Sequence, residues 1–531
     1  MDLSKRLIIT QPMYFSEPSE KCGYCHGNKQ DESQFYSLPS WEKPTDAEGA
    51  TVHYNCTLGF QAESISIEVY DKLCNNGFRR SGKFLYKPDL LRSCCRLFTI
   101  RTQPDQVKLT KELKTCVKRF SKYVSDESAQ QAPKKNNKAP FDYREIITDA
   151  QLNSKRFYSK LEPATFTKEK YELFARYQET IHDDFKHSES GFRRFLCDSP
   201  FNDDVVQGTK EEWDSLNAIF SKDGEEVTPH RLGPAHECYY FDDKLIAIGV
   251  IDFLPSGISS VYFIYDPDYK HWSLGKLSAL KELTLLSRLK LPYYYLGYYV
   301  EDCHKMNYKA SYGGELLDIV NLEYISLNHL KENNILDGGK LFVMNHDKDT
   351  NAELSMNNAL KKSGKGVYQS MVELDQLTNV AEQIYGSHPT KGAFAALSQA
   401  VEDLQELGIR YTLDSREDIF DFVKDKNTND EENSESVTAS ENEHDDEEID
   451  PKLKFPNVVP GLIPLPELRT MVAENQLSEL NGNLFLFDLA IHRIRPVFDI
   501  LEESPQTLMM VCNLVRVLGL ELTKQCLVII T

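Results

Sequence analysis

The sequence lacks the long apolar runs of a membrane protein. No apolar stretch approaches the roughly 18–20 residues that a helix needs to cross a bilayer, and the one at residues 7–9 is too short for a signal peptide. Cysteine is too dilute, at 12 among 531 residues, for a disulfide scaffold. We therefore expect a soluble protein of a reducing compartment, with no membrane partner. The cytoplasm is the expected location, with the nucleus as a second one.

Glycine-rich phosphate loops are also missing. The chain contains neither a G-x-G-x-x-G nor a G-K-[ST] motif, which disfavours a bound nucleotide. Apolar residues make up 40% of the chain and aromatic residues 11%, which excludes collagen-like and wholly disordered proteins. A chain of this length suggests about two to four domains.

Charge is unevenly spread along the chain. The net charge is −21, yet residues 425–450 hold 12 carboxylates against one lysine, so this segment alone contributes −11. It has almost no apolar residues to offset its ordering entropy, which predicts a disordered insert. Residues 71–122 show the opposite bias, with 14 Lys and Arg against 4 Asp and Glu, a net of +10. This basic segment fits either a phosphate backbone or a solvated face that keeps the domain soluble.

Polar segments divide the chain. They predict an N-terminal domain over 1–124, a polar linker over 125–139, a central domain over 140–413, an acidic insert over 414–451, and a C-terminal segment over 452–531 that packs on the central domain. In the central domain, the periodicity predicts helices at 168–181, 273–289 and 305–312 and strands at 237–241, 245–253, 259–265 and 293–300. This order is typical of an α/β layer.

Four cysteines of the first domain have metal-ligand spacing. Cys22 and Cys25 form a C-x-x-C knuckle, and Cys94 and Cys95 follow as an adjacent pair. Zn²⁺ and iron–sulfur clusters both accept four thiolates. Because adjacent side chains tend to diverge, His26 is a possible substitute ligand. Four buried inert thiols and a dithiol redox pair are the alternatives.

A basic, aromatic-rich segment leads into the second cysteine pair. A helix is expected to end at Gly77, where glycine adopts the left-handed cap, and Arg79, Arg80, Lys83 and Lys87 follow it. Arginine pairs beside aromatic rings suit the capture of a carboxylate or phosphate. The alternative is a charged hairpin edge that discourages sheet aggregation.

Short motifs throughout the first and central domains match one known family. They are Cys-Gly-Tyr-Cys at 22–25, Asn-Gly-Phe-Arg-Arg-Ser-Gly at 76–82, Phe-Leu-Cys-Asp-Ser-Pro at 195–200, Ile-Gly-Val-Ile-Asp at 248–252, Tyr-Asp-Pro-Asp-Tyr at 265–269 and Cys-His-Lys-Met-Asn-Tyr-Lys at 303–309. In these motifs and their order, the sequence resembles the arginyl-tRNA–protein transferases. The resemblance covers about residues 20–125 and 165–315, and the long, divergent C-terminal half is similar to fungal members.

The resemblance implies a fold and an activity. The fold would be α/β (α+β), with a GNAT-like acyltransferase domain and a small N-terminal domain for metal binding and acceptor recognition. The enzyme would move arginine from Arg-tRNA to the N-terminal α-amine of proteins that begin with Asp, Glu or oxidised Cys. This step would mark them for ubiquitin-dependent degradation through the N-degron pathway. Cys22, Cys25, Cys94 and Cys95 would bind an iron–sulfur cluster or zinc.

The chemistry can be divided among candidate residues. The donor ester is already activated, so positioning supplies much of the catalysis and no covalent nucleophile is required. The expected catalytic residues are Tyr262, Tyr265, Asp266, Glu282 and Tyr308. The expected substrate-binding residues are the cations Arg79, Arg80, His236 and Lys305 for the acidic acceptor, and the carboxylates Asp252, Glu301 and Asp302 for the arginyl group. Lys83, Lys87, Tyr298, Lys309 and Tyr312 are expected to bind the tRNA.

Two other functions remain open. A coenzyme A-dependent acetyltransferase would need a glycine-rich pyrophosphate loop, but residues 271–279 hold a single glycine, so we expect no coenzyme A. A non-enzymatic adaptor for acidic N-termini is the second alternative. The expected partners are Arg-tRNA and acceptor proteins, without DNA, and the expected state is a monomer. The whole interpretation requires the turn of Arg79 and Arg80 to share a cavity with the Tyr262–Tyr308 cleft, where a cationic and an anionic pocket meet.

Overall fold

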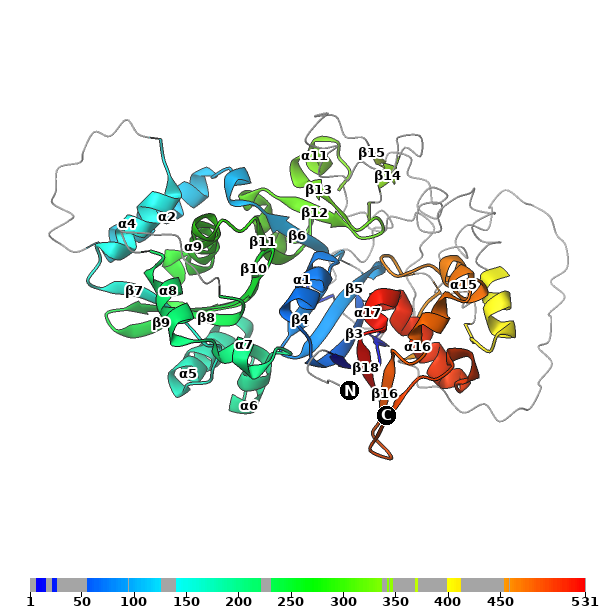
Figure 1. Cartoon of the computed structure of the whole chain (residues 1–531). Coiled ribbons are helices and arrows are strands. Elements are labelled where there is room, and N and C mark those ends of the chain that lie inside the picture. The colour runs from blue at the N-terminus through cyan, green and yellow to red at the C-terminus, as the bar shows by residue number, and fades with distance from the viewer. Residues whose placement is uncertain are drawn as a thin grey trace.

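The strands of the computed structural model form two large mixed sheets (Figure 1). The structure describes residues 6–15, 22–25, 55–93, 95–125, 140–220, 231–336, 341–342, 344–346, 368–370, 399–411, 453–457 and 459–530. The predicted acidic insert, almost all of the predicted linker, His26 and Cys94 lie outside these residues. None of the described helices is long and apolar enough to cross a bilayer.

The first sheet combines the two ends of the chain. In spatial order it contains β17 (Arg493–Pro496), β16 (Phe485–Asp488), β18 (Cys526–Ile530), β1 (Leu7–Thr10), β3 (Asn55–Ser64), β5 (Phe84–Ser93) and β4 (Arg79–Ser81), with β2 (Met13–Phe15) beside β3. β18 pairs in parallel with both β1 and β16. The strands of the C-terminal segment therefore complete the N-terminal sheet. The segment also contacts the predicted central domain, where Arg469 pairs with Asp403 at 2.5 Å and Tyr411 donates to Asn513 at 2.6 Å.

The second sheet is formed mostly by strands of the central region. In spatial order it contains β13 (Glu323–Ser326), β12 (Glu315–Asp318), β6 (Phe98–Thr102), β11 (Tyr293–Tyr299), β10 (Gly257–Tyr265), β9 (Lys244–Leu254), β8 (Gly233–Phe241) and β7 (Phe157–Glu162). A separate pair joins β14 (Met344–His346) to β15 (Tyr368–Ser370). The predicted boundary at residue 124 is wrong as a structural division, since β6 already lies between β11 and β12.

Helices cover both faces of the second sheet. They include α2 (Lys111–Val124), α4 (Tyr143–Leu152), α5 (Lys168–Tyr177), α6 (Glu189–Phe192), α7 (Asp203–Gln207), α8 (Lys210–Ala218), α9 (Leu274–Leu289), α10 (His304–Asn307) and α11 (Leu327–Glu332). α9 packs on β10 and β11 together with α2 and α4, while α5 packs on β9 and β10 from the opposite face. The predicted helices and strands of this region are confirmed, with small shifts at their ends.

Other helices belong to the two ends of the chain. α1 (Ile67–Asn75) follows β3, and α15 (Leu465–Ala473), α16 (Pro505–Leu518) and α17 (Leu520–Thr523) accompany the C-terminal strands. α1 begins at Ile67, because residues 55–64 form β3 and Ser66 caps the helix. Gly77 takes the expected left-handed conformation, with φ of 94°. The first sheet thus lies between the C-terminal helices and the second sheet (Figure 1).

Candidate functional site

The strands β10 and β11 part within the second sheet. They share only three parallel register pairs, from Gly257 with Tyr293 to Ser259 with Tyr295. Beyond this point β10 pairs with β9, while β11 pairs with β6 and has a register shift before Tyr298. We call the opening beyond Ser259 and Tyr295 the β10–β11 fork. Backbone groups on its inner edges lose their ladder partners, so a fork of this kind can receive another molecule.

Buried cations hold β11 beyond the fork. Lys309 donates from Nζ to the Tyr298 carbonyl at 2.6 Å, and Arg79 donates to the Gly297 carbonyl at 3.4 Å. Arg79 also donates to the Cys74 and Phe78 carbonyls, at 2.8 and 2.6 Å. Neither cation forms an ion pair with a carboxylate of the described residues. Burial lowers the pKa of Lys309 to about 7, so its ammonium form is poorly stabilised where it lies.

The predicted cation Arg80 and the predicted anion Asp252 bind each other. Arg80 Nε and Nη2 donate to the two Asp252 oxygens at 2.7 and 2.6 Å, and both side chains are almost completely buried. This bidentate pair joins β4 of the first sheet to β9 of the second. The sequence predicts that Arg80 binds the acceptor and Asp252 the arginyl group, and the structure contradicts these roles because each charge is already neutralised by the other.

Glu282 lies on α9 and is 1% exposed. One of its oxygens accepts a hydrogen bond from Ser278 Oγ at 2.5 Å, whereas Oε2 has no hydrogen-bond partner among the described residues. Burial raises the pKa of this carboxyl to about 7. Burial, followed by the Glu282 charge and a hydrogen bond to Glu282, raises the pKa of Tyr294, and burial followed by the Glu282 charge raises the pKa of Tyr308. The charge of Glu282 therefore acts on Tyr308, and both are predicted catalytic residues.

The other predicted carboxylates are occupied. Asp266 is 1% exposed, accepts from Lys244 at 2.6 Å and from Arg176 at 3.1 Å, and caps the short helix that follows β10. Glu301 accepts from the Tyr299 hydroxyl and pairs with Lys331 at 3.3 Å. These contacts contradict a free anionic role for Asp266. The exposed residues Asp302 and Lys305 lie on the surface beyond β11, and their predicted roles stay predictions.

His236 is not a cation in this fold. It is fully buried on β8, where its ring nitrogens contact Lys170 Nζ at 3.1 Å and the Leu196 carbonyl at 2.9 Å. Burial, and then the Lys170 charge, lower the pKa of the imidazole to about 3. A neutral ring cannot attract an acidic side chain, so the predicted role of His236 in acceptor binding is wrong.

Several predicted tRNA contacts are also buried. Lys87 is 2% exposed and donates to the Gly461 carbonyl at 3.1 Å, and burial lowers its pKa to about 7. Tyr298 donates to the Gly77 carbonyl at 3.0 Å, and Tyr312 has no exposed surface. A phosphate backbone cannot reach these side chains, or Lys309, in this conformation. Sequence reasoning failed here because a buried lysine without a carboxylate is rare.

An open cavity lies between the first sheet and the segment that contains α6. It has a volume of about 520 Å³ and is lined by Gln61, Glu63, Ser81, Lys83, Phe84, Gly191, Arg194, Phe195 and Asp198. Lys83 pairs with Glu63 at 2.7 Å across a half-exposed contact. Arg194 is exposed and lies on η5 (Arg193–Cys197), a helical turn after α6. The cavity therefore has two cations and two carboxylates on its walls.

The turn between β4 and β5 forms one wall of this cavity. Gly82 has φ of 59°, and a Cβ atom there would lie 2.1 Å from the Arg194 carbonyl oxygen. Only glycine permits so close an approach of the turn to η5. The motif at residues 195–200 indicated this segment, but its residue types alone did not show that Arg194 and Phe195 face a cavity.

The cavity lies close to the fork without including the residues that we expected. The Phe195 ring packs against the Tyr262 ring of β10, with 5.0 Å between the ring centroids. Tyr262 and Tyr265 both pack on Tyr177 of α5. Ser81 lines the cavity, whereas Arg79, Arg80 and Tyr262 do not. The predicted meeting of an arginine-lined pocket with an anionic pocket is therefore wrong in that form, because the two arginines are buried between the sheets.

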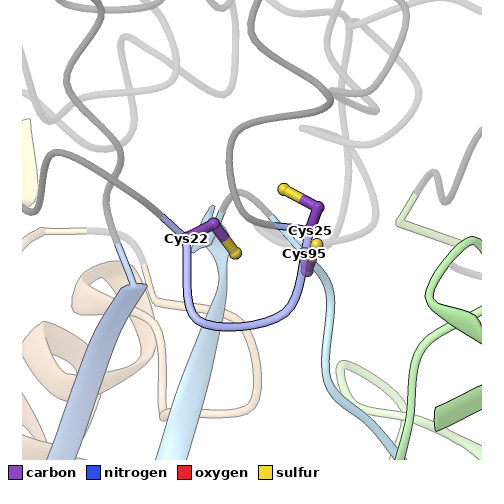
Figure 2. Close-up of side chains that lie close together, drawn as sticks. All are labelled: Cys22, Cys25 and Cys95. Atoms are coloured by element: carbon purple, nitrogen blue, oxygen red, sulfur yellow. The ribbon is translucent and has the colours of Figure 1, made fainter. Parts of the chain in front are cut away.

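Three cysteines gather beside the fork. The sulfurs of Cys22, Cys25 and Cys95 all lie within 4.8 Å of one another, and all three residues are buried. Figure 2 shows Cys22 and Cys25 on one short loop, with Cys95 next to Cys25. Sulfurs on one tetrahedral zinc lie about 3.8 Å apart, given a Zn–S distance of about 2.3 Å. The donor set therefore fits a metal centre. Cys303, which follows β11, contacts the same loop at the Tyr24 carbonyl at 3.5 Å.

Comparison with known proteins supports the expected family. Residues 20–115 match the family described as "Arginine-tRNA-protein transferase, N terminus", and residues 169–318 match its "C terminus" counterpart. The chain is 40% identical over 169 residues to "Arginyl-tRNA--protein transferase 1" of Arabidopsis thaliana, which covers 30% of this chain and 24% of that protein. It is 30% identical over 272 residues to "Aspartate/glutamate leucyltransferase" of Stutzerimonas stutzeri, covering 50% of this chain and 86% of that protein.

The most extensive of these similarities spans almost the whole sequence. The chain is 42% identical over 522 residues to "Arginyl-tRNA--protein transferase 1" of Saccharomyces cerevisiae, covering 98% of this chain and 97% of that protein. Such coverage includes the first sheet, the fork and the C-terminal strands. It follows that the chain is an aminoacyl-tRNA transferase that belongs to the arginyl-tRNA–protein transferase family.

Proposed function

We propose that this enzyme transfers arginine to proteins with an acidic N-terminal residue, Asp, Glu or oxidised Cys, and that it acts in the N-degron pathway. One observation carries the proposal: the cavity lined by Arg194 and Lys83 lies one ring contact away from Tyr262 and the β10–β11 fork. The name of the Stutzerimonas stutzeri relative, which specifies aspartate and glutamate, is consistent with such an acceptor.

The cavity suits the end of a peptide. A volume of about 520 Å³ accommodates one or two residues. The cavity opens to solvent, so the rest of the acceptor chain can extend out of it. An acidic side chain can bind the Arg194 guanidinium in a bidentate manner. Glu63 and Asp198 would attract the protonated amine before it loses its proton. We therefore assign acceptor binding to Arg194 and Lys83 in place of Arg79, Arg80 and His236.

The transfer reaction needs little from the protein beyond positioning. The neutral α-amine attacks the carbonyl carbon of the arginyl ester, the new N–C bond forms, and the C–O bond to the terminal ribose breaks. The amine proton leaves to a base or water, and the ribose oxygen gains a proton. A free α-amine has a pKa of about 7.7–8, so a modest base suffices. The fork supports our expectation of a GNAT-like acyltransferase domain, since it separates two neighbouring strands at the place where donor and acceptor would meet.

An acceptor assay with a matched pair of variants tests the proposal. Labelled arginine from purified Arg-tRNA should appear on a peptide that begins with Asp and not on one that begins with Ala. In the Arg194→Ala variant, we expect the KM for the Asp peptide to rise about 10- to 100-fold, because a charge-assisted contact is lost. The KM for Arg-tRNA should stay within about twofold.

The neighbouring variant Arg193→Ala is the control, because Arg193 lies over the Phe166 ring at 3.6 Å and does not line the cavity. Both of its KM values should remain close to those of the wild type. Equal transfer to the Asp and Ala peptides, or label that follows acetyl-CoA, would contradict the proposed function. A loss of Arg-tRNA binding alone in Arg194→Ala would contradict the assignment of the cavity.

The metal centre is the second part of the proposal. We expect Cys22, Cys25 and Cys95, with Cys94 as fourth ligand, to hold zinc or an iron–sulfur cluster. Such a centre would fix the loop that contacts Cys303 after β11. The Cys95→Ser variant should contain less than half of the metal of the wild type, measured by elemental analysis. Full metal content in that variant would exclude Cys95 as a ligand. A monomer in the cytoplasm and nucleus, without a DNA partner, remains part of the proposal.

A further inference from the structure

The carboxylates around the β10–β11 fork differ in how they are satisfied. Asp252 is held by Arg80, Asp266 by Lys244 and Arg176, and Glu301 by Lys331 and Tyr299. Each of these groups has a cation within 3.3 Å. Glu282 has no such partner in the part of the chain that the structure describes. It is therefore the carboxyl group best suited to receive a cation from outside the protein.

The neighbouring lysine on α9 does not satisfy Glu282. Lys281 is fully buried, and its Nζ binds Glu237 at 2.9 Å, Gln151 at 2.8 Å and Ser159 at 2.6 Å. These three contacts use all of its donors. Ser278 donates a hydrogen bond to Glu282 at 2.5 Å and the Tyr294 hydroxyl also lies against this carboxyl, yet Oε2 has no hydrogen-bond partner among the described residues. A buried carboxyl oxygen without a partner costs free energy, and natural folds keep such a group where it has a use.

Glu282 also lies in the right part of the molecule. α9 packs across both β10 and β11, and Glu282 Oε1 lies 3.6 Å from where a Cβ atom of Gly249 would stand, on the β9 residue that pairs with Phe263 of β10 beyond the fork. Tyr294 is the second of the three paired β11 residues, and Tyr308 begins η7 (Tyr308–Tyr312) beyond the fork. Tyr308 is 41% exposed. The tyrosine rings therefore connect a fully buried carboxyl to the surface of the protein.

We propose that Glu282 is the specificity-determining residue of the donor site and that its Oε2 receives the guanidinium of the arginyl group on the tRNA. This inference rests on the proposed function. A guanidinium presents planar donors that match a carboxylate, and its faces stack well on aromatic rings such as Tyr308. A neutral donor side chain would leave the Glu282 charge buried and unpaired, which disfavours its binding. The site thus selects arginine by charge as well as by shape.

Binding of small donor analogues separates this role from a structural one. The probes are 3′-arginylamino-3′-deoxyadenosine, a stable amide analogue of the tRNA terminus, and the same compound with citrulline, which has similar shape and no charge. The wild type should bind the arginine compound about 10- to 100-fold more tightly. In Glu282→Gln, the preference should fall to within about threefold, mainly through weaker binding of the arginine compound.

Two further variants keep the test decisive. Glu282→Asp retains the charge on a shorter side chain and should keep part of the preference, even if Glu282→Gln folds poorly. Glu315→Gln alters a partly buried carboxylate on β12, which β6 separates from β11, and should keep the full preference.

The possible failures are distinguishable. An undiminished preference for the arginine compound in Glu282→Gln would overturn the role of Glu282 and leave the proposed function intact. If the wild type transfers arginine to an Asp peptide yet binds both compounds equally, the role of Glu282 is likewise overturned and the proposed function stands. A wild type that transfers no arginine would overturn both.

Discussion

Two buried regions of this enzyme carry full charges and treat them in opposite ways. Between the sheets, Arg80 and Asp252 form a bidentate pair in which both charges are matched. Beside the β10–β11 fork, Glu282 keeps an oxygen without a hydrogen-bond partner among the described residues, and the Lys309 and Arg79 cations donate to backbone carbonyls of β11. The first region holds two sheets together. The second region contains buried charged groups without matched partners beside the proposed donor site.

The difference shows why a charged residue in a motif does not reveal its role. A buried pair that is broken by removing one member leaves the other charge uncompensated, which destabilises the fold strongly. A buried group that has no partner already costs stability, so its replacement by a neutral isostere can be harmless or favourable. Stability measurements can therefore distinguish the two regions without any substrate.

Breaking the matched pair should have the largest effect. We expect Asp252→Ala to lower the free energy of unfolding by about 3–5 kcal/mol, because the Arg80 guanidinium is left buried without its carboxylate. Urea unfolding of the full chain, followed by circular dichroism, measures this loss. The double variant Arg80→Met, Asp252→Leu should recover most of it, since an apolar pair of similar volume needs no charge compensation. A loss below about 1 kcal/mol for Asp252→Ala would show that the pair does not join the sheets.

Neutralising the unmatched group should have a smaller effect of opposite sign. The pKa of Glu282 is raised from 4.5 to about 7 in the folded chain. Its contribution to stability is therefore full below pH 4.5 and is lost as the pH rises through 7. We expect Glu282→Gln to be more stable than the wild type at pH 8, by about 1–3 kcal/mol, with the advantage absent at pH 4.5. A large destabilisation at pH 8 would mean that the carboxylate is matched by a group that the fold supplies.

The arrangement of strands within the central region could be predicted from the sequence. The turns at Asp242 and Gly257 separate runs of apolar residues, and the hairpins β8–β9 and β9–β10 follow from this local pattern. Such pairings join neighbours in sequence, where turn chemistry fixes the register. The same reasoning correctly placed α5, α9 and β11.

Long-range partners could not be predicted in this way. β1 pairs with β18 across almost the whole chain, and Arg80 meets Asp252 at a separation of 172 residues. Each of these residues has an ordinary local sequence, and nothing in it identifies the distant partner. Lys87 and Lys309 follow aromatic residues in basic segments, as surface lysines often do, yet the fold buries both against carbonyls. The charge pattern of a sequence therefore predicts the overall composition of a surface well, but it predicts poorly whether one particular side chain is buried.

A buried neutral group offers a third, intermediate case. The pKa of His236 falls from 6.5 to about 3 on folding, so stability is full above pH 6.5 and declines as the pH falls toward 3. In His236→Gln, an amide can replace both hydrogen bonds without taking up a proton. The loss of stability between pH 6.5 and 4.5 should then be shallower by up to about 1.4 kcal/mol per pH unit. Parallel curves for variant and wild type would place the acid sensitivity elsewhere, and the measurement is urea unfolding at several pH values.

The exposed pair of Lys83 and Glu63 should contribute least to stability. Both side chains are more than a third exposed, so water and salt screen the contact and Lys83→Ala should change the free energy of unfolding by less than about 0.5 kcal/mol. Lys83 is nevertheless the predicted tRNA contact that can reach a phosphate. If it neutralises one phosphate, the slope of log K against log salt concentration for Arg-tRNA binding should become shallower by about 0.7–0.9 in Lys83→Ala. Glu63→Gln is the control, because it leaves the lysine in place and should keep the slope. An unchanged slope in Lys83→Ala would show that the tRNA backbone passes elsewhere, and Lys83 would then serve only the acceptor cavity.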